Sequence, residues 1–428
     1  MPMLSPGLIT MLTLRNTSLS TLWPRYVLET LSRMIMRWET GRRNGRVLED
    51  RGGGRKRVCV DGRLLAAEAT GVATYARTVV AALAATGDPP LILCDGAGGR
   101  FASVEGRFAQ GRRWLAARTS RAVSLVPRGA ELFAPDVFRR AQARFNASGR
   151  LLELVAPGPP GVMHWTWPVP ARIVGWANLY TVHDVIPLTD PELGTTNAAG
   201  FRARLDALLA SGAWLASVSE HARREILAAL DIAPARVLDC GSAVEVASPA
   251  EPLPAGMEPG FFLFCGSTEP RKNLERILAA WRAAETSRPL VLAGHSPRGD
   301  RGAGVIELGF VPRPLLLSLL AAARALVFPT LAEGFGLPVI EAMALGTPVL
   351  TSDRGALAEV AGGAALAVDP RDMVAIGGAI ARLDREDALC AGLVVAGLRR
   401  ARHFSPADFG IRLRRAYGEI AGDLPDAA

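Results

Sequence analysis

Short apolar runs alternate with longer stretches of helical periodicity from residue 57 onward. Apolar runs of about 4–8 residues between polar or glycine-containing breaks indicate buried strands, and helices placed between such strands favour a parallel sheet. We therefore predict an α/β domain in the first half of the chain. Its expected strands are RVCV (57–60), LILCD (91–95), the run before His164, LYTVHD (179–184) and WLASVS (214–219), with helices from about Gly71, over 200–211 and over 220–230.

The alternation stops around residues 244–260, where proline, glycine and small residues follow one another without a period. Such a composition is typical of a linker. The strand pattern then resumes, which predicts an extension at 1–56, a first domain at 57–245, a linker at 246–260, a second domain at 261–405 and a C-terminal segment at 406–428. The second domain's expected strands are FFLFCGS (261–267), PLVLAGH (289–295), VIELGFV (305–311), ALVFPT (325–330) and TPVLTS (347–352). A single large doubly wound domain is the alternative, and the linker counts against it.

The composition fits this organisation and restricts the class of protein. The chain has 428 residues, of which 49% are hydrophobic and 21% charged, enough for two domains with real cores. Five dispersed cysteines without metal spacing predict free thiols in a reducing compartment, and hence a cytoplasmic protein. No apolar run reaches 18 residues, so we expect no transmembrane helix.

The basic charge is concentrated in the first residues. Of the net charge of +8, residues 1–57 contribute +7, with eleven basic and four acidic side chains. The near-neutral remainder argues against nucleic-acid binding. Residues 20–40 have the pattern of a short amphipathic helix, and residues 41–57 are rich in glycine and arginine. A flexible extension or mis-assigned start, a membrane-surface anchor and a transit peptide all remain open.

The segment LVFPTLAEGFGLPVIEAMALGTPVLTS (326–352) carries the first candidate chemistry. A buried strand is expected to end in a glycine-rich turn, and a helix is expected to begin near Pro338 and to end near Gly346. Backbone N–H groups at such a helix N-terminus suit phosphate and hydroxyl groups. Two carboxylates flank this turn: Glu333 lies in the loop, and Glu341 lies one turn into the expected helix.

The segment CGSTEPRKN (265–273) is the second candidate, again between an expected strand and an expected helix. Gly266 permits close backbone approach, while Arg271 and Lys272 offer the forked and compact cations that suit a diphosphate. Lys272 is one of only two lysines among 49 basic residues. A cation near a helix N-terminus meets an unfavourable dipole, so it needs an anion nearby.

Together these motifs resemble those of the retaining GT-B glycosyltransferases of family 4, the group 1 transferases, and the resemblance covers about residues 57–420. It implies an α/β GT-B fold in which two Rossmann-like domains face each other across a cleft. In this family the arginine and lysine hold the diphosphate of a nucleotide-sugar, and the second glutamate accepts hydrogen bonds from both ribose hydroxyls. The first glutamate holds hydroxyls of the donor sugar. The donor-binding residues so implied are Gly71, Gly266, Arg271, Lys272, Phe310, Val311, Gly334, Phe335, Gly336, Leu337 and Glu341.

The resemblance also assigns roles in the first domain. The pair His183–Asp184 in VHDVIP matches a family pair that faces the donor sugar, so His183, Asp184 and Glu333 are the implied catalytic residues. Without the resemblance, a core histidine with a satisfied nitrogen is the favoured interpretation of His183. Gly71 and Tyr75, in GVATY, match the family's glycine loop, although only one glycine is present.

Aromatic residues mark a candidate acceptor site. Tyr75 and the tryptophans Trp165 and Trp167 of HWTWP are candidates to line it, with core aromatics as the alternative. Ser219 is interpreted as a structural N-cap. The resemblance implies that residues 406–428 form a helix packing back toward the first domain, although Pro406 replaces the tryptophan common in relatives.

The function implied is a cytoplasmic, bacterial, retaining hexosyltransferase of mannosyltransferase type. It would move a sugar from a nucleotide-sugar, such as GDP-mannose, to a glycan or lipid-linked glycan acceptor in polysaccharide biosynthesis. No cofactor and no metal are expected, because no carboxylate or histidine cluster is apparent. If the tail is an anchor, it implies peripheral contact with the inner face of the membrane. A nucleotide-sugar epimerase and a non-catalytic GT-B partner are the alternatives, and the intact motifs argue against both.

Overall fold

The computed structural model describes residues 57–67, 70–95, 122–246, 249, 251–294 and 301–422. The predictions for the extension at 1–56 lie outside these residues. Among the helices that are described, none is long and apolar enough to cross a membrane. The five cysteines are free thiols, and all but the half-buried Cys94 are buried.

The first half of the chain forms a mainly parallel eight-stranded sheet in the order β11-β10-β9-β7-β1-β2-β5-β4, in which only β4 and β5 pair antiparallel. Its strands are β1 (Arg57–Asp61), β2 (Leu91–Cys94), β4 (Val126–Arg128), β5 (Glu131–Phe133), β7 (Gly161–Trp165), β9 (Ala177–Val182), β10 (Trp214–Ser217) and β11 (Val237–Asp239). A separate parallel sheet has the order β3 (Ala122–Ser124), β6 (Leu152–Val155) and β8 (Ala171–Ile173). The strand order of the large sheet reverses between β1 and β7.

The second half forms a parallel six-stranded sheet in the order β14-β13-β12-β15-β16-β17. Its strands are β12 (Phe262–Cys265), β13 (Leu290–Ala293), β14 (Val305–Gly309), β15 (Ala325–Phe328), β16 (Val349–Ser352) and β17 (Leu366–Val368). This is the strand order of the Rossmann fold, whose ligands bind beyond the carboxyl ends of the strands at the reversal between β12 and β15. Separate sheets on either side of the predicted linker exclude a single doubly wound domain.

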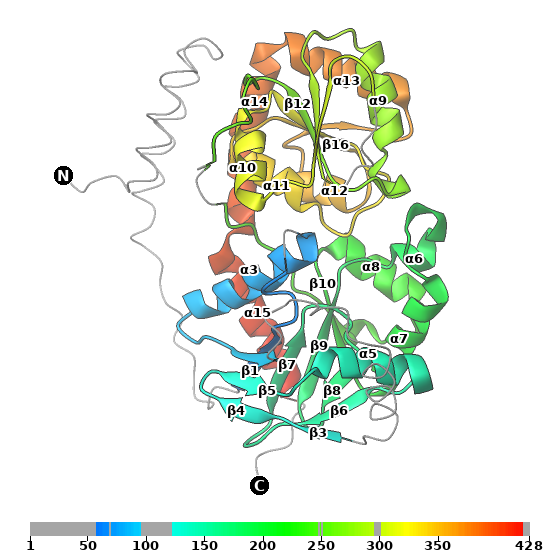
Figure 1. The fold of residues 1–428 in the computed structure, drawn as a ribbon, viewed down its shortest axis with the longest axis vertical. Coiled ribbons are helices and arrows are strands. Elements are labelled where there is room, and N and C mark those ends of the chain that lie inside the picture. The colour runs from blue at the N-terminus through cyan, green and yellow to red at the C-terminus, as the bar shows by residue number, and fades with distance from the viewer. Residues whose placement is uncertain are drawn as a thin grey trace, which may run out of the picture.

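Helices cover the faces of both sheets (Figure 1). In the first domain they are α3 (Gly71–Ala85), α5 (Val137–Ser148), α6 (Ile186–Thr189), α7 (Ala198–Ala210) and α8 (Glu220–Ala229), with 3-10 turns η1 (Pro191–Leu193) and η2 (Pro234–Arg236). In the second they are α9 (Leu274–Ala283), α10 (Arg313–Ala322), α11 (Leu337–Ala344), α12 (Gly355–Ala361), α13 (Met373–Arg385) and α14 (Asp387–Ala401), with 3-10 turns η3 (Pro270–Lys272) and η4 (Arg402–Phe404).

The last described helix, α15 (Pro406–Ala421), leaves the second domain and packs against α3 of the first. Figure 1 shows it in red beside the blue α3. Phe409 and Leu413 of α15 are fully buried in one core cluster with Val79 of α3. Pro406 stands at the first helical position, where its missing N–H costs nothing, and Ser405 caps the helix by accepting from the Asp408 N–H at 3.1 Å.

Candidate functional site

A cleft of about 740 Å³ is lined by the strand and helix ends of both domains. It lies beyond β12, where the second sheet reverses its order, as expected for a Rossmann-like domain. Its lining includes every predicted site residue except Trp165 and Trp167. The predicted residues that it brings together are Gly71, Tyr75, His183, Asp184, Gly266, Arg271, Lys272, Phe310, Val311, Glu333, Gly334, Phe335, Gly336, Leu337 and Glu341.

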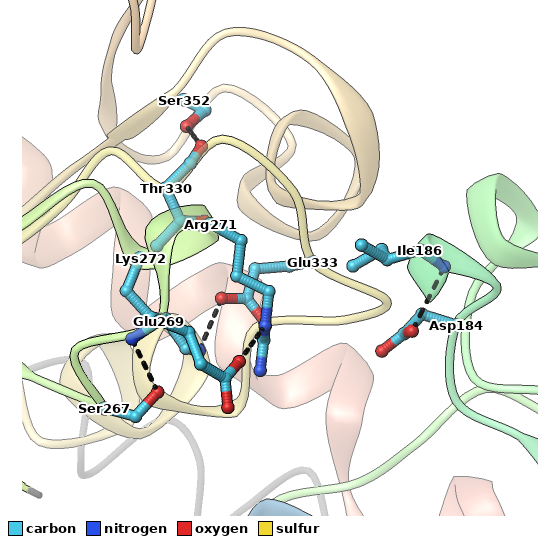
Figure 2. A network of polar contacts seen from close by, with 9 residues as sticks. All are labelled: Asp184, Ile186, Ser267, Glu269, Arg271, Lys272, Thr330, Glu333 and Ser352. Atoms are coloured by element: carbon cyan, nitrogen blue, oxygen red, sulfur yellow. Dashed lines mark hydrogen bonds and ion pairs between the residues drawn. The ribbon is translucent and has the colours of Figure 1, made fainter. Parts of the chain in front are cut away.

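Arg271 and Lys272 both bind the carboxylate of Glu333, an arrangement that we call the carboxylate clasp. Lys272 Nζ lies 2.6 Å from Glu333 Oε1, and Arg271 Nη1 lies 2.9 Å from Oε2. The side chains of Lys272 and Glu333 are only 12% and 10% exposed. Figure 2 shows Arg271 also bound to Glu269, at 2.6 Å. The carboxylate of Glu333 therefore supplies the anion that was expected beside Lys272.

The charges of the clasp stabilise one another. Burial alone would raise the pKa of Glu333, but Lys272 and Arg271 outweigh it and hold this pKa below its usual range. Glu333 and Glu269 in turn raise the pKa of Arg271, against the effect of burial. A pair of cations that already binds one carboxylate at a cleft wall is suited to bind the oxygens of a diphosphate in its place.

The turn that presents the two cations is held by Asn273. This residue has a left-handed backbone with φ of 62°, and its Nδ2 donates to the carbonyls of Pro329 and Pro370, at 2.9 and 2.7 Å. Asn tolerates this conformation better than most residues do. The side chain therefore ties the turn before α9 to the loop after β15, which carries Glu333.

Glu341, one turn into α11, is only 2% exposed and accepts from Arg313 Nη1 at 2.6 Å. Arg313 begins α10 and also lines the cleft. The ion pair compensates the burial of this carboxylate. It uses Oε1, so Oε2 retains its capacity to accept hydroxyl hydrogens.

The glycine turn of the second domain touches the first domain directly. A Cβ atom on Gly334 would lie 1.8 Å from the carbonyl oxygen of His183, so only glycine fits there. Ser219 caps α8 by accepting from the Ala222 N–H at 3.0 Å, which agrees with its structural interpretation, and it donates to the Gly334 carbonyl at 2.7 Å. Glu359 of α12 further accepts from the first N–H groups of α8.

His183 and Asp184 follow β9 at the first-domain wall of the cleft. His183 Nε2 lies 3.0 Å from the carbonyl oxygen of Thr166, and the His183 ring meets the Tyr75 ring edge-on, with centroids 4.9 Å apart. Burial lowers the pKa of His183 to about 4, so its imidazole is neutral near pH 7. Burial raises the pKa of Asp184, against the charge of Arg271 across the cleft (Figure 2).

The aromatic candidates for the acceptor site have different surroundings. Trp165 is fully buried, stacks on Tyr180 with centroids 5.8 Å apart and donates to Asn178 Oδ1, so its prediction as an acceptor-binding residue is wrong. Trp167 is half-buried and stacks on His183 at 5.9 Å, and an acceptor contact stays a prediction for it. Tyr75 is among the residues that line the cleft, but it is only 1% exposed and its hydroxyl binds Thr181 at 3.2 Å inside the core, so an acceptor contact stays a prediction for it as well.

Comparisons with known proteins agree with this geometry. The profile of the family Glycosyl transferases group 1 matches residues 259–385. O-antigen chain mannosyltransferase B of Escherichia coli is 34% identical over 250 residues, which cover 53% of this chain and 66% of that protein. The chain belongs to the group 1 glycosyltransferases.

The remaining comparisons define how far the likeness extends. Serotype-specific mannosyltransferase WbdA of Escherichia coli is 29% identical over 273 residues, 57% of this chain and 34% of that protein. The chain thus spans about a third to two thirds of these relatives. Sucrose-phosphate synthase from Thermosynechococcus elongatus superposes with a TM-score of 0.61 at 20% identity, covering 86% of this chain and 100% of that one. This likeness confirms the predicted GT-B fold.

The cleft of this group 1 glycosyltransferase also contains residues that the motifs did not predict. Arg313 is the most consequential, because it neutralises Glu341; its only sequence signal is its place between two prolines, shortly after the expected strand at 305–311. Thr70, Thr74 and Ser242 add hydroxyl groups from the first domain. Within the described residues, no group of three or more His, Cys, Asp or Glu side chains is arranged to hold a metal ion.

Proposed function

We propose that this glycosyltransferase moves a hexosyl group from a nucleoside diphosphate sugar to a glycan or lipid-linked glycan acceptor, with retention of anomeric configuration. The meeting of the carboxylate clasp and Glu341 in one cleft carries the proposal. GDP-mannose is the first candidate donor, because the relatives are named as mannosyltransferases.

In the proposed complex the diphosphate replaces Glu333 on Arg271 and Lys272. The diphosphate carries more negative charge than one carboxylate, so the exchange is favourable, and it frees Glu333 to accept hydroxyl hydrogens from the donor sugar. Glu341 accepts from the ribose hydroxyls. His183, neutral at pH 7, binds a hydroxyl of the sugar from the other side.

The reaction breaks the bond between C1 of the sugar and the diphosphate oxygen. The acceptor oxygen bonds to C1 on the same face, and its proton passes to the leaving phosphate. Arg271 and Lys272 neutralise the charge that grows on the diphosphate, so the proposal requires neither a metal ion nor a cofactor. The same proposal locates the reaction in the bacterial cytoplasm, with residues 1–56 as a peripheral contact to the membrane.

A ligand screen followed by a turnover assay tests this function. Bound nucleotide raises the apparent stability, by about 2.7 kcal/mol at a hundred-fold excess over Kd. We expect GDP, UDP or another nucleoside diphosphate to raise Tm, and the matching sugar nucleotide to release nucleoside diphosphate when a mannoside acceptor is added. Proton NMR of the product should show the donor's anomeric configuration. Binding without turnover would indicate a non-catalytic partner, and isomerisation of the donor sugar would indicate an epimerase.

A further inference from the structure

Asp61 is a buried carboxylate that the proposed reaction does not use. It ends β1 and is fully buried, next to Thr166, which directly follows the neighbouring strand β7 and is also fully buried. Asp61 Oδ2 accepts from both the backbone N–H and the hydroxyl of Thr166, the latter at 2.9 Å. These two residues stand where the first sheet reverses its strand order, the place where such sheets bind ligands.

Thr166 connects this carboxylate to His183. Its carbonyl oxygen lies 3.0 Å from His183 Nε2, and a carbonyl oxygen can only accept, so Nε2 carries the hydrogen. The neutral imidazole then has an unprotonated Nδ1, which is a hydrogen-bond acceptor. The Tyr75 ring, edge-on at 4.9 Å, and the Trp167 ring, stacked at 5.9 Å, restrict the imidazole from two further sides.

Asp61 is held at this place although burial disfavours its charge. Burial raises the pKa of Asp61 to about 6, which shows that the site disfavours the ionised form that a carboxylate normally takes. Thr166 opposes this shift through two hydrogen bonds, from its backbone N–H and its hydroxyl, and Arg63 opposes it through its charge and its backbone. The remaining polar backbone atom of Thr166, its carbonyl oxygen, orients His183.

We propose that Asp61 is a positioning residue for sugar transfer: by holding Thr166, it keeps the hydrogen of His183 on Nε2 and leaves Nδ1 to accept a hydrogen bond from a hydroxyl of the donor sugar. This role rests on the proposed function. It deepens that function by naming a residue that acts through His183 without touching the substrate.

The first experiment reads the tautomer directly in the full chain. The chain has five histidines, so ¹⁵N imidazole NMR with His183→Gln as the assignment variant identifies the His183 signals. We expect wild type and Asp61→Asn to hold the Nε2–H form, because the amide oxygen can accept both Thr166 hydrogens. Asp61→Ala should populate both tautomers. Asp239→Ala is the matched control, since Asp239 also ends a strand of this sheet and accepts from a hydroxyl and a backbone N–H, those of Ser217 and Gly241.

The second experiment measures donor turnover in two backgrounds. Asp61→Ala should lower kcat about 10- to 100-fold with a smaller change in KM, because it misplaces a group that acts on the bound sugar. In the His183→Ala background the same change should have less than about a two-fold effect, since non-additivity is the sign that two residues act as a unit.

An unchanged His183 tautomer in folded Asp61→Ala, or equal losses in both backgrounds, would overturn the proposal. If Asp61→Ala is insoluble, Asp61→Ser, whose hydroxyl is too short to hold both Thr166 atoms, takes its place with the same expected result. Wild type that turns over no sugar nucleotide but keeps the Nε2–H form would refute the proposed function, and not the coupling of Asp61 to His183.

Discussion

Replacing Lys272 by methionine removes one of the two cations of the carboxylate clasp and nearly preserves side-chain volume. The lost contact is the ion pair at 2.6 Å between Lys272 Nζ and Glu333 Oε1. Arg271 remains at 2.9 Å on the other carboxylate oxygen. The variant therefore separates the role of the second cation from that of the pocket's shape.

Two losses follow, with different magnitudes. A charge-assisted contact to a developing charge contributes about 2–4 kcal/mol to the transition state, so kcat/KM should fall about 30- to 1000-fold. Breaking a buried ion pair costs about 3–5 kcal/mol when the remaining charge is unpaired. Because Arg271 still binds Glu333, we expect about 1–3 kcal/mol here, and hence a Tm lower by roughly 2–10 °C.

Turnover and thermal unfolding, each with and without nucleoside diphosphate, measure both quantities. Adding Glu333→Gln to Lys272→Met should recover most of the lost Tm, because no uncompensated carboxylate remains, without recovering activity. Arg415→Met is the matched control, since Arg415 forms an exposed ion pair with Glu419 and should change stability by less than about 1 kcal/mol. Near-wild-type transfer by Lys272→Met at saturating donor would refute the assignment of the diphosphate to the clasp.

Four further predictions address the rest of the chain. Glu341→Ala should mainly weaken nucleoside diphosphate affinity and Glu333→Ala should mainly lower turnover, so equal affinity losses by calorimetry would contradict this division. Transfer should survive EDTA, and full inactivation reversed by magnesium or manganese would exclude charge neutralisation by the two cations alone. His164 should contribute a fall of about 1 kcal/mol per pH unit to the free energy of unfolding from pH 6 to 4, because burial lowers its pKa to about 3 and only the unfolded chain takes up that proton; the curve of His164→Gln should lack this contribution. His183, whose pKa burial lowers to about 4, acts in the same direction, and Asp61, whose pKa burial raises to about 6, acts in the opposite one. Deletion of residues 1–55 should leave donor hydrolysis intact and reduce binding to anionic vesicles, whereas equal vesicle binding would favour a tail without an anchoring role.

The fold was largely predictable because its central strands are continuous apolar runs between glycine-rich turns. Strands such as β12 and β15 are buried on both faces, which makes them recognisable without an alternating pattern. Strand β4 (Val126–Arg128) has three residues, all exposed, and so carries no apolar signal. Short strands of this kind are defined by pairing with neighbours, which no local pattern reports.

The sequence predicted which residues line the site better than it predicted which of them contact one another. Arg271 and Lys272 follow from local motif chemistry, but their pairing with Glu333 joins residues about sixty positions apart. Trp165 was predicted to line the site and does not. Its strand β7 is buried at every position, so an aromatic side chain there points into the core on either face of the sheet. A tryptophan in a core and one on a sugar-binding surface have the same appearance in a sequence.

The helix α15 bears on how the protein folds during synthesis. Phe409 and Leu413 complete a core that also contains Val79, and Tyr417 binds His164 at 2.7 Å in the interior of the first domain. These side chains leave the ribosome more than three hundred residues after α3. The core of the first domain therefore stays incomplete while the second domain is synthesised, and the face of α3 that packs against α15 is exposed until α15 has emerged.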